Sequence, residues 1–105
     1  MIIVEEVCGN ILNTRFFGSK LKRKIKDELE NYEGKAILDF SDIKSISQSF
    51  ADECFGKLVI DLGKEEFKNK IDIRNISKEE SKVIKYVILQ RLKKDKEDYQ
   101  QPVKA

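Results

Sequence analysis

Residues 38–56 read LDFSDIKSISQSFADECFG, and this stretch decides the fold. A short apolar run opens it, a turn rich in serine follows, and apolar side chains then recur at helical spacing. This order predicts a buried strand that passes through a loop into a helix. The helix is expected over residues 49–62, with Gly63 at its end. Ser49 is predicted to be the N-cap, whose hydroxyl accepts a hydrogen bond from the backbone N–H of Asp52.

Strands and helices alternate on both sides of this stretch. Strands are predicted at residues 2–7, 11–12, 36–40 and 71–76, and the third is expected at the centre of the sheet because it hardly alternates. Apolar side chains at every fourth position predict an earlier helix from about residue 18 to Gly34. Ser77 and Glu80 form a capping box that opens the last helix. Residues 41–48 and 65–69 are expected to be loop and connector.

The fold class is therefore predicted to be α/β, in the order β-β-α-β-α-β-α, with a mainly parallel sheet. A length of 105 residues suits one domain. This domain is assigned to residues 1–94. Residues 95–105 lose the apolar pattern and are predicted to be a polar, disordered tail.

Composition excludes some classes of function and argues against others. The chain has no histidine, which removes a histidine general base, histidine-activated nucleophiles and most zinc sites. Its 21 basic and 19 acidic residues nearly cancel, whereas a nucleic-acid binder usually has a larger basic excess. Cys54 is expected to be a buried free thiol, far in sequence from Cys8. This cysteine usage predicts a cytoplasmic location, and no apolar run approaches the roughly 20 residues that span a bilayer.

Ser49 has two interpretations. A serine at an N-cap stabilises a helix by about 1 kcal/mol without any further role. A phosphate on the same serine would meet free backbone N–H groups and the positive end of the helix dipole. Asp52 and Glu53, in the same turn, would oppose that phosphate.

Two other groups of side chains are candidates for chemistry. The carboxylates of Asp39, Asp42, Asp52 and Glu53 could converge at the carboxyl end of the central strand, where oxygen ligands of this kind could hold Mg²⁺. The alternative is that they are turn residues and acids of a first helical turn, and no metal or cofactor is predicted. Arg15 and Lys20, near Gly18, are candidates for an anion site at a helix start, against the alternative of solvated cations.

The chain resembles the STAS-like domains of unknown function of bacteria and some archaea, which are distantly similar to anti-sigma-factor antagonists. The resemblance covers most of residues 2–92 and is most specific at Asp39-Phe40, at 49–53 (SFADE) and at Phe55-Gly56. It implies a four-stranded, mostly parallel sheet with three helices packed mainly on one face. It also implies a partner protein of the GHKL ATPase or kinase type, with Ser49 as the phosphoacceptor.

We therefore expect a non-enzymatic regulatory module that binds a partner protein, with phosphorylation of Ser49 as the switch in the sharper form of the hypothesis. The expected partner-binding residues are Ser45, Ser47, Gln48, Ser49, Phe50, Asp52 and Glu53. One alternative is a nucleic-acid-associated factor that uses the basic first helix through Lys20, Lys22, Arg23, Lys24 and Lys26. A metal-dependent enzyme built on the four carboxylates and a homo-oligomerisation module are the others.

Overall fold

The computed structural model describes the backbone of residues 1–31 and 34–100 and the side chains of residues 1–31 and 34–94. Within these residues the chain is an α/β fold with five short strands in two parallel sheets. Strands β1 (Ile2–Ile3), β3 (Ala36–Asp39) and β5 (Ile71–Arg74) form one sheet in the order β1-β3-β5. Strands β2 (Ile11–Leu12) and β4 (Ser45–Ile46) form the other. The predicted parallel pairing with β3 at the centre is confirmed, whereas the prediction of four strands in one sheet is wrong.

A short helix explains the second sheet. Helix α1 (Val4–Cys8) occupies most of the predicted first strand, which ends after Ile3. Val4, Val7 and Cys8 follow helical spacing and face the core, while Glu5 and Glu6 in the first turn suit the helix dipole. Because α1 and Gly9, at a φ of 78°, intervene, β2 is displaced from β1 and pairs with β4 instead. Strand β4 lies within residues 41–48, which were predicted to be a loop, so that prediction is wrong at Ser45 and Ile46.

Helix α2 (Arg15–Asn31) is the predicted first helix and begins earlier than expected. The Thr14 hydroxyl accepts a hydrogen bond from the Phe17 backbone N–H at 3.2 Å, so Thr14 caps the helix start. Leu21 and Ile25 are fully buried, which confirms the predicted apolar stripe. Gly34, at a φ of 75°, donates its N–H to the carbonyl of Leu29, as expected of a residue that follows a helix.

The central helix differs from its prediction at its start. It runs without a break through α3 (Gln48–Ala51), a π-helical segment η1 (Asp52–Gly56) and α4 (Lys57–Leu62), and Gly63 ends it as predicted. The N-cap is Ser47 and not Ser49, because the Ser47 hydroxyl accepts from the Phe50 N–H at 3.1 Å. The backbone N–H of Ser47 donates to the Leu12 carbonyl, so pairing with β2 keeps Ser47 extended and the helix begins directly after it.

The residues after Gly63 form a helix in place of the predicted connector. Helix α5 (Lys64–Lys70) has Glu65 and Glu66 in its first turn and Lys68 and Lys70 in its last, an order that matches the helix dipole. Phe67 in this helix packs edge-on against Phe55, with 6.4 Å between ring centroids. The contact gives the polar segment an apolar anchor.

Helix α6 (Lys78–Gln100) begins at the predicted capping box. The Glu80 N–H donates to the Ser77 hydroxyl at 3.1 Å, and the Ser77 N–H donates to the Glu80 carboxylate at 3.4 Å. The helix runs on to Gln100, so its last turns overlap the predicted tail, and residues 101–105 lie outside the described part of the chain. No helix of the described residues combines the length and the apolar character that a membrane crossing needs.

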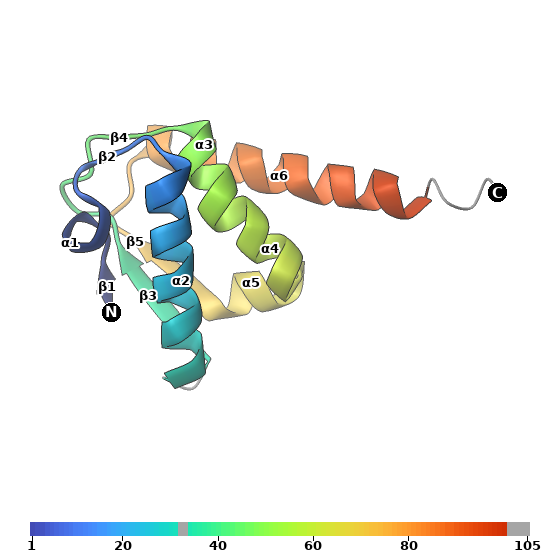
Figure 1. Cartoon of the computed structure of the whole chain (residues 1–105), viewed down its shortest axis with the longest axis horizontal. Coiled ribbons are helices and arrows are strands. Elements are labelled where there is room, and N and C mark those ends of the chain that lie inside the picture. Colours follow the sequence, from blue (N-terminus) through green and yellow to red (C-terminus); the bar gives the residue numbers. More distant parts are fainter. Residues whose placement is uncertain (32–33, 101–105) are drawn as a thin grey trace.

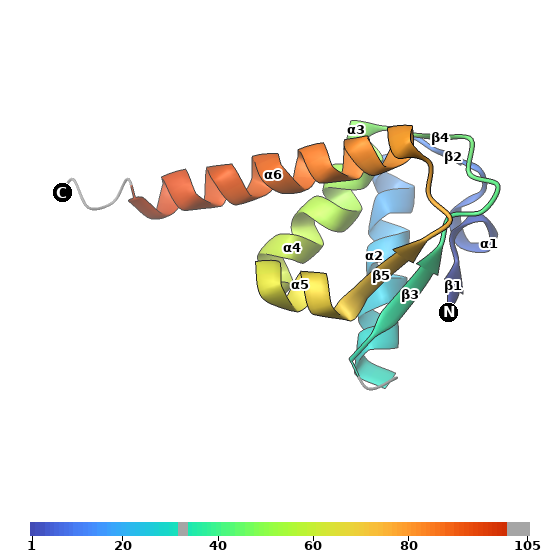
Figure 2. The ribbon, with the colours of Figure 1, turned by 180° about the vertical axis from the view of Figure 1, so that it is seen from behind.

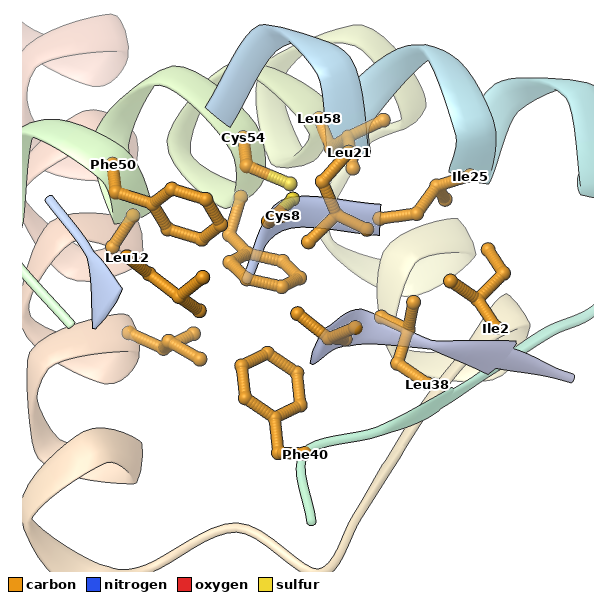
Figure 3. Packing of buried hydrophobic residues seen from close by; sticks show 14 of the residues in the cluster. Ile2, Cys8, Leu12, Leu21, Ile25, Leu38, Phe40, Phe50, Cys54 and Leu58 are labelled. Carbon is orange, nitrogen blue, oxygen red and sulfur yellow. The ribbon is translucent and has the colours of Figure 1, made fainter. Parts of the chain in front are cut away.

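The helices and the three-stranded sheet form two layers. Helix α2 lies on one side of the sheet, in front of β3 in Figure 1 and behind it in the reverse view of Figure 2. Helix α6 crosses one end of these layers and then extends away from them. The core between the layers contains the fully buried Leu38, Phe50 and Leu58 (Figure 3).

Both cysteines belong to this core. Cys54 is fully buried and Cys8 nearly so, and both are free thiols, which confirms the prediction for Cys54. Burial raises the pKa of Cys8 to about 11 and raises that of Cys54 as well. Neither thiol is therefore ionised at neutral pH.

Candidate functional site

Ser49 lies in an open pocket where three helices meet. Its side chain is exposed at the second helical position after the Ser47 cap. The pocket has a volume of about 300 Å³ and is lined by Arg15 of α2, by Gln48, Ser49 and Asp52 of the central helix, and by Tyr86, Val87 and Gln90 of α6. Residues from three distant parts of the sequence therefore surround the predicted phosphoacceptor.

A second pocket lies where β4 faces the start of α6. It has a volume of about 390 Å³, and its lining includes Ser45 and Ile46 of β4 and Glu80 and Val83 of α6. Residues 45–52, in which most of the predicted docking residues lie, thus face α6 in both pockets. Helix α6 lines both pockets, although no residue of α6 was predicted to belong to the site.

The predicted partner-binding residues differ in exposure. Ser45, Gln48 and Ser49 are exposed, and Ser47 is half-buried because its hydroxyl caps the helix. Phe50 is fully buried in the core, so its inclusion in the docking surface was wrong. It lies three residues after the cap, a position at which its side chain turns inward with Ala51 and Cys54.

Asp52 is held between two arginines. Arg91 of α6 forms a paired contact, with Nε 2.7 Å from Oδ1 and Nη2 2.8 Å from Oδ2. Arg15 of α2 lies 3.1 Å from the same Oδ2. The hydrogen bonds from Arg91 are the largest cause of a pKa of Asp52 that is lowered from 3.8 to about 2. Arg15 lowers this pKa further, and together the two arginines outweigh burial, which acts to raise it. The carboxylate is ionised at neutral pH and links three helices.

Glu53 lies in a second group of cations. Its carboxylate is 2.9 Å from Lys57 Nζ, 3.3 Å from Arg15 Nη1 and 3.7 Å from Lys22 Nζ. Burial acts to raise the pKa of Glu53, but hydrogen bonds and charge from these cations lower it overall. Asp52 and Glu53 were expected to oppose a phosphate on Ser49, and their pairing with cations reduces that opposition.

The four predicted metal ligands do not converge. Asp39 accepts hydrogen bonds from the Ser41 hydroxyl at 2.6 Å, the Ser41 N–H and the Asn75 amide, and the Ser41 bonds are the main cause of its lowered pKa. Asp42 is exposed in a turn with a φ of 64°. In the part of the chain that the structure describes, no group of three or more acids and cysteines is placed to hold a metal ion. The alternative of a metal site at the end of β3 is therefore contradicted for the described residues, and Asp52 and Glu53 instead pair with cations of α2, α4 and α6.

The two predicted anion-binding residues, Arg15 and Lys20, do not line the same pocket. Arg15 lines the Ser49 pocket, and its side chain is 53% exposed even with its contacts to Asp52 and Glu53. Lys20 does not line that pocket, and its Nζ lies 5.9 Å from the centre of the Phe17 ring. Lys22 and Lys26, two cations of the predicted basic stripe, form ion pairs with Glu53 and Asp61.

A glycine allows Arg91 to reach Asp52. A Cβ atom at position 56 would lie 2.6 Å from Asp52 Oδ1 and 3.0 Å from Arg91 Cγ, so only glycine leaves room for this ion pair. Gly56 ends the π-helical segment η1, and π-helical turns are frequent at functional sites. The sequence pointed to Gly56 through the family resemblance, whereas the partner of Asp52 lies 39 positions further on, and no local pattern indicated it.

The chain is similar to one family of known sequences. The family model described as "STAS-like domain of unknown function (DUF4325)" matches residues 18–80, which is more than half of the chain. The matched range begins at Gly18, contains the whole of η1 and ends at the Glu80 of the capping box. Comparisons with curated proteins and with solved structures gave no match.

Proposed function

This chain belongs to the family of STAS-like domains of unknown function, and from that premise we propose that it is a cytoplasmic regulatory module that binds a partner protein and is not itself an enzyme. The observation that carries the proposal is the exposed Ser49 in an open pocket between α2, α3 and α6. The acids beside it are ionised and paired with cations, an arrangement that suits recognition better than proton donation at neutral pH.

The proposed partner is a kinase or ATPase of the GHKL type, because the family is similar to the anti-sigma-factor antagonists. The γ-phosphoryl group of the ATP bound by this partner would pass to the Ser49 oxygen. The new O–P bond forms, the bond between the γ-phosphorus and the ADP oxygen breaks, and the serine proton is released. A phosphate at this position is favoured by the helix dipole and by the Arg15 guanidinium in the same pocket. Phosphorylation would then change the surface that the partner meets.

The experiment is co-expression of the protein with the GHKL-type ATPase encoded nearest to it, followed by intact-mass measurement. We expect the added mass of one phosphoryl group, lost in Ser49→Ala and kept in Ser19→Ala, which changes a half-buried serine of α2 that lines neither pocket. In a pull-down with the same ATPase, Ser49→Asp should bind differently from Ser49→Ala. If no phosphate is found and both variants bind like the unchanged protein, the proposed switch is wrong.

A further inference from the structure

One side of helix α6 carries apolar side chains in contact with solvent. Tyr86 is 48% exposed and Leu89 is 65% exposed, although the opposite side of the helix buries Ile84 and Val87 in the core. Tyr86 also lines the Ser49 pocket. The exposed apolar side chains are thus continuous with the site of the proposed function.

Lysines surround these two side chains. The exposed positions of α6 from residue 78 to residue 94 hold five lysines against one acid, Glu79. Lys82, Tyr86, Leu89 and Lys93 follow one another at intervals of four, three and four residues, which places them in one row along the helix. This row spans about 16 Å, or three helical turns. Alternation of three and four is the spacing with which one helix packs against another.

We propose that this row, with Tyr86 and Leu89 at its centre, binds an acidic amphipathic helix of the partner protein. The proposal rests on the proposed function and adds the chemistry of the partner. Apolar side chains of the partner helix would cover Tyr86 and Leu89, and its acids would pair with the flanking lysines. An apolar centre inside a polar rim is the usual anatomy of a protein interface, and tyrosine is among the residues that most often carry its binding energy.

The position of the row explains how Ser49 would control binding. The partner helix, resting on Tyr86, lies beside the pocket that contains Ser49. A phosphate there adds negative charge next to an acidic partner and attracts the Arg15 guanidinium to itself. Phosphorylation of Ser49 therefore weakens binding of the partner helix.

The test uses a synthetic peptide of about 18 residues, long enough for five helical turns, with leucine at alternating intervals of three and four and glutamate on both flanks. Its binding to the full chain is measured by fluorescence anisotropy at low and physiological salt. The double variant Tyr86→Ala/Leu89→Ala is expected to weaken binding about tenfold or more. The double variant Lys82→Glu/Lys93→Glu, which reverses both charges of the row, should do the same and should regain binding to a peptide with lysine in place of glutamate.

Matched controls are Ile11→Ala, which removes an exposed apolar side chain of β2, and Lys24→Glu, which reverses an exposed charge of α2; both should bind as the unchanged protein does. Circular dichroism checks that every variant is folded. Equal binding of a scrambled peptide of the same composition, or no binding at all, would overturn the proposal. So would tighter binding to anionic lipid vesicles, or a self-associated protein that Tyr86→Ala/Leu89→Ala turns into a monomer.

The two proposals fail separately. If the α6 variants capture the GHKL-type ATPase normally while Ser49→Asp does not, the acidic-helix proposal is wrong and the Ser49 switch stands. If the peptide binds as predicted and no phosphate appears on Ser49, the binding row stands and the switch is wrong.

Discussion

The ion pair between Asp52 and Arg91 is expected to fasten α6 to the central helix, and Arg91→Met tests this. Both guanidinium contacts are shorter than 2.9 Å, and the Asp52 side chain is only 21% exposed. A pKa lowered from 3.8 to about 2 corresponds to about 2.5 kcal/mol of stabilisation of the ionised form. Arg15, one of the contributors, is half exposed and Arg91 is one-third exposed, so solvent screening reduces the expected coupling to about 1–1.5 kcal/mol.

The assay is a double-mutant cycle of Arg91→Met and Asp52→Asn, followed by denaturant unfolding. Because the folded-state pKa of Asp52 is lowered, the stabilisation is fully present above pH 3.8 and is lost as the pH falls toward 2. The coupling energy should therefore be about 1–1.5 kcal/mol at pH 7 and should decline across that interval. The exposed pair Lys26–Asp61 is the control, with an expected coupling below about 0.5 kcal/mol. A coupling of zero at pH 7, or one that does not change down to pH 2, would refute the reasoning.

Four further substitutions test the packing and the caps by thermal or denaturant unfolding. Ser47→Ala should lower the free energy of unfolding by about 1 kcal/mol, whereas Ser49→Ala should change it by less than about 0.5 kcal/mol. A larger loss of stability in Ser49→Ala than in Ser47→Ala would identify Ser49 as the N-cap and contradict the hydrogen bond of Ser47. Gly18→Ala should cost about 1–3 kcal/mol, since its new methyl group would lie 2.7 Å from the Phe50 carbonyl oxygen, and an unchanged melting temperature would contradict that contact. Ser77→Ala should cost about 1 kcal/mol and speed amide hydrogen exchange in the first turn of α6, and unchanged exchange there would contradict the capping box.

Local patterns of the sequence predicted those elements whose ends and faces are encoded nearby. The stripe through Leu21 and Ile25, the stop at Gly63 and the box of Ser77 and Glu80 all involve residues within about four positions of one another. The same reasoning failed at residues 4–8, where apolar and β-branched side chains suggested a strand although Val4, Val7 and Cys8 also follow helical spacing. Short apolar segments are ambiguous in this way, and burial against α2 resolves them.

The candidate site was predicted in part. The sequence selected the exposed Ser49 and placed Arg15 near it, and the structure brings both to one pocket. It did not assign Tyr86 or Arg91 to the site, because nothing near them in the chain distinguishes them from other residues of an amphipathic helix. It also assigned a docking role to Phe50, which core packing buries.

The sequence by itself therefore determined the α/β class, the central position of β3, the end of the central helix at Gly63 and the start of α6 at Ser77, because the apolar run of β3 and these two end signals are each encoded within a few residues. Only the tertiary structure decided which serine caps the central helix, since a hydrogen bond from Ser47 to Leu12, 35 positions earlier, fixes it. Only the tertiary structure also placed α6 beside Ser49, through the pairing of Arg91 with Asp52 across 39 positions. Contacts of that range depend on how the layers pack, and packing is a property of the whole folded chain.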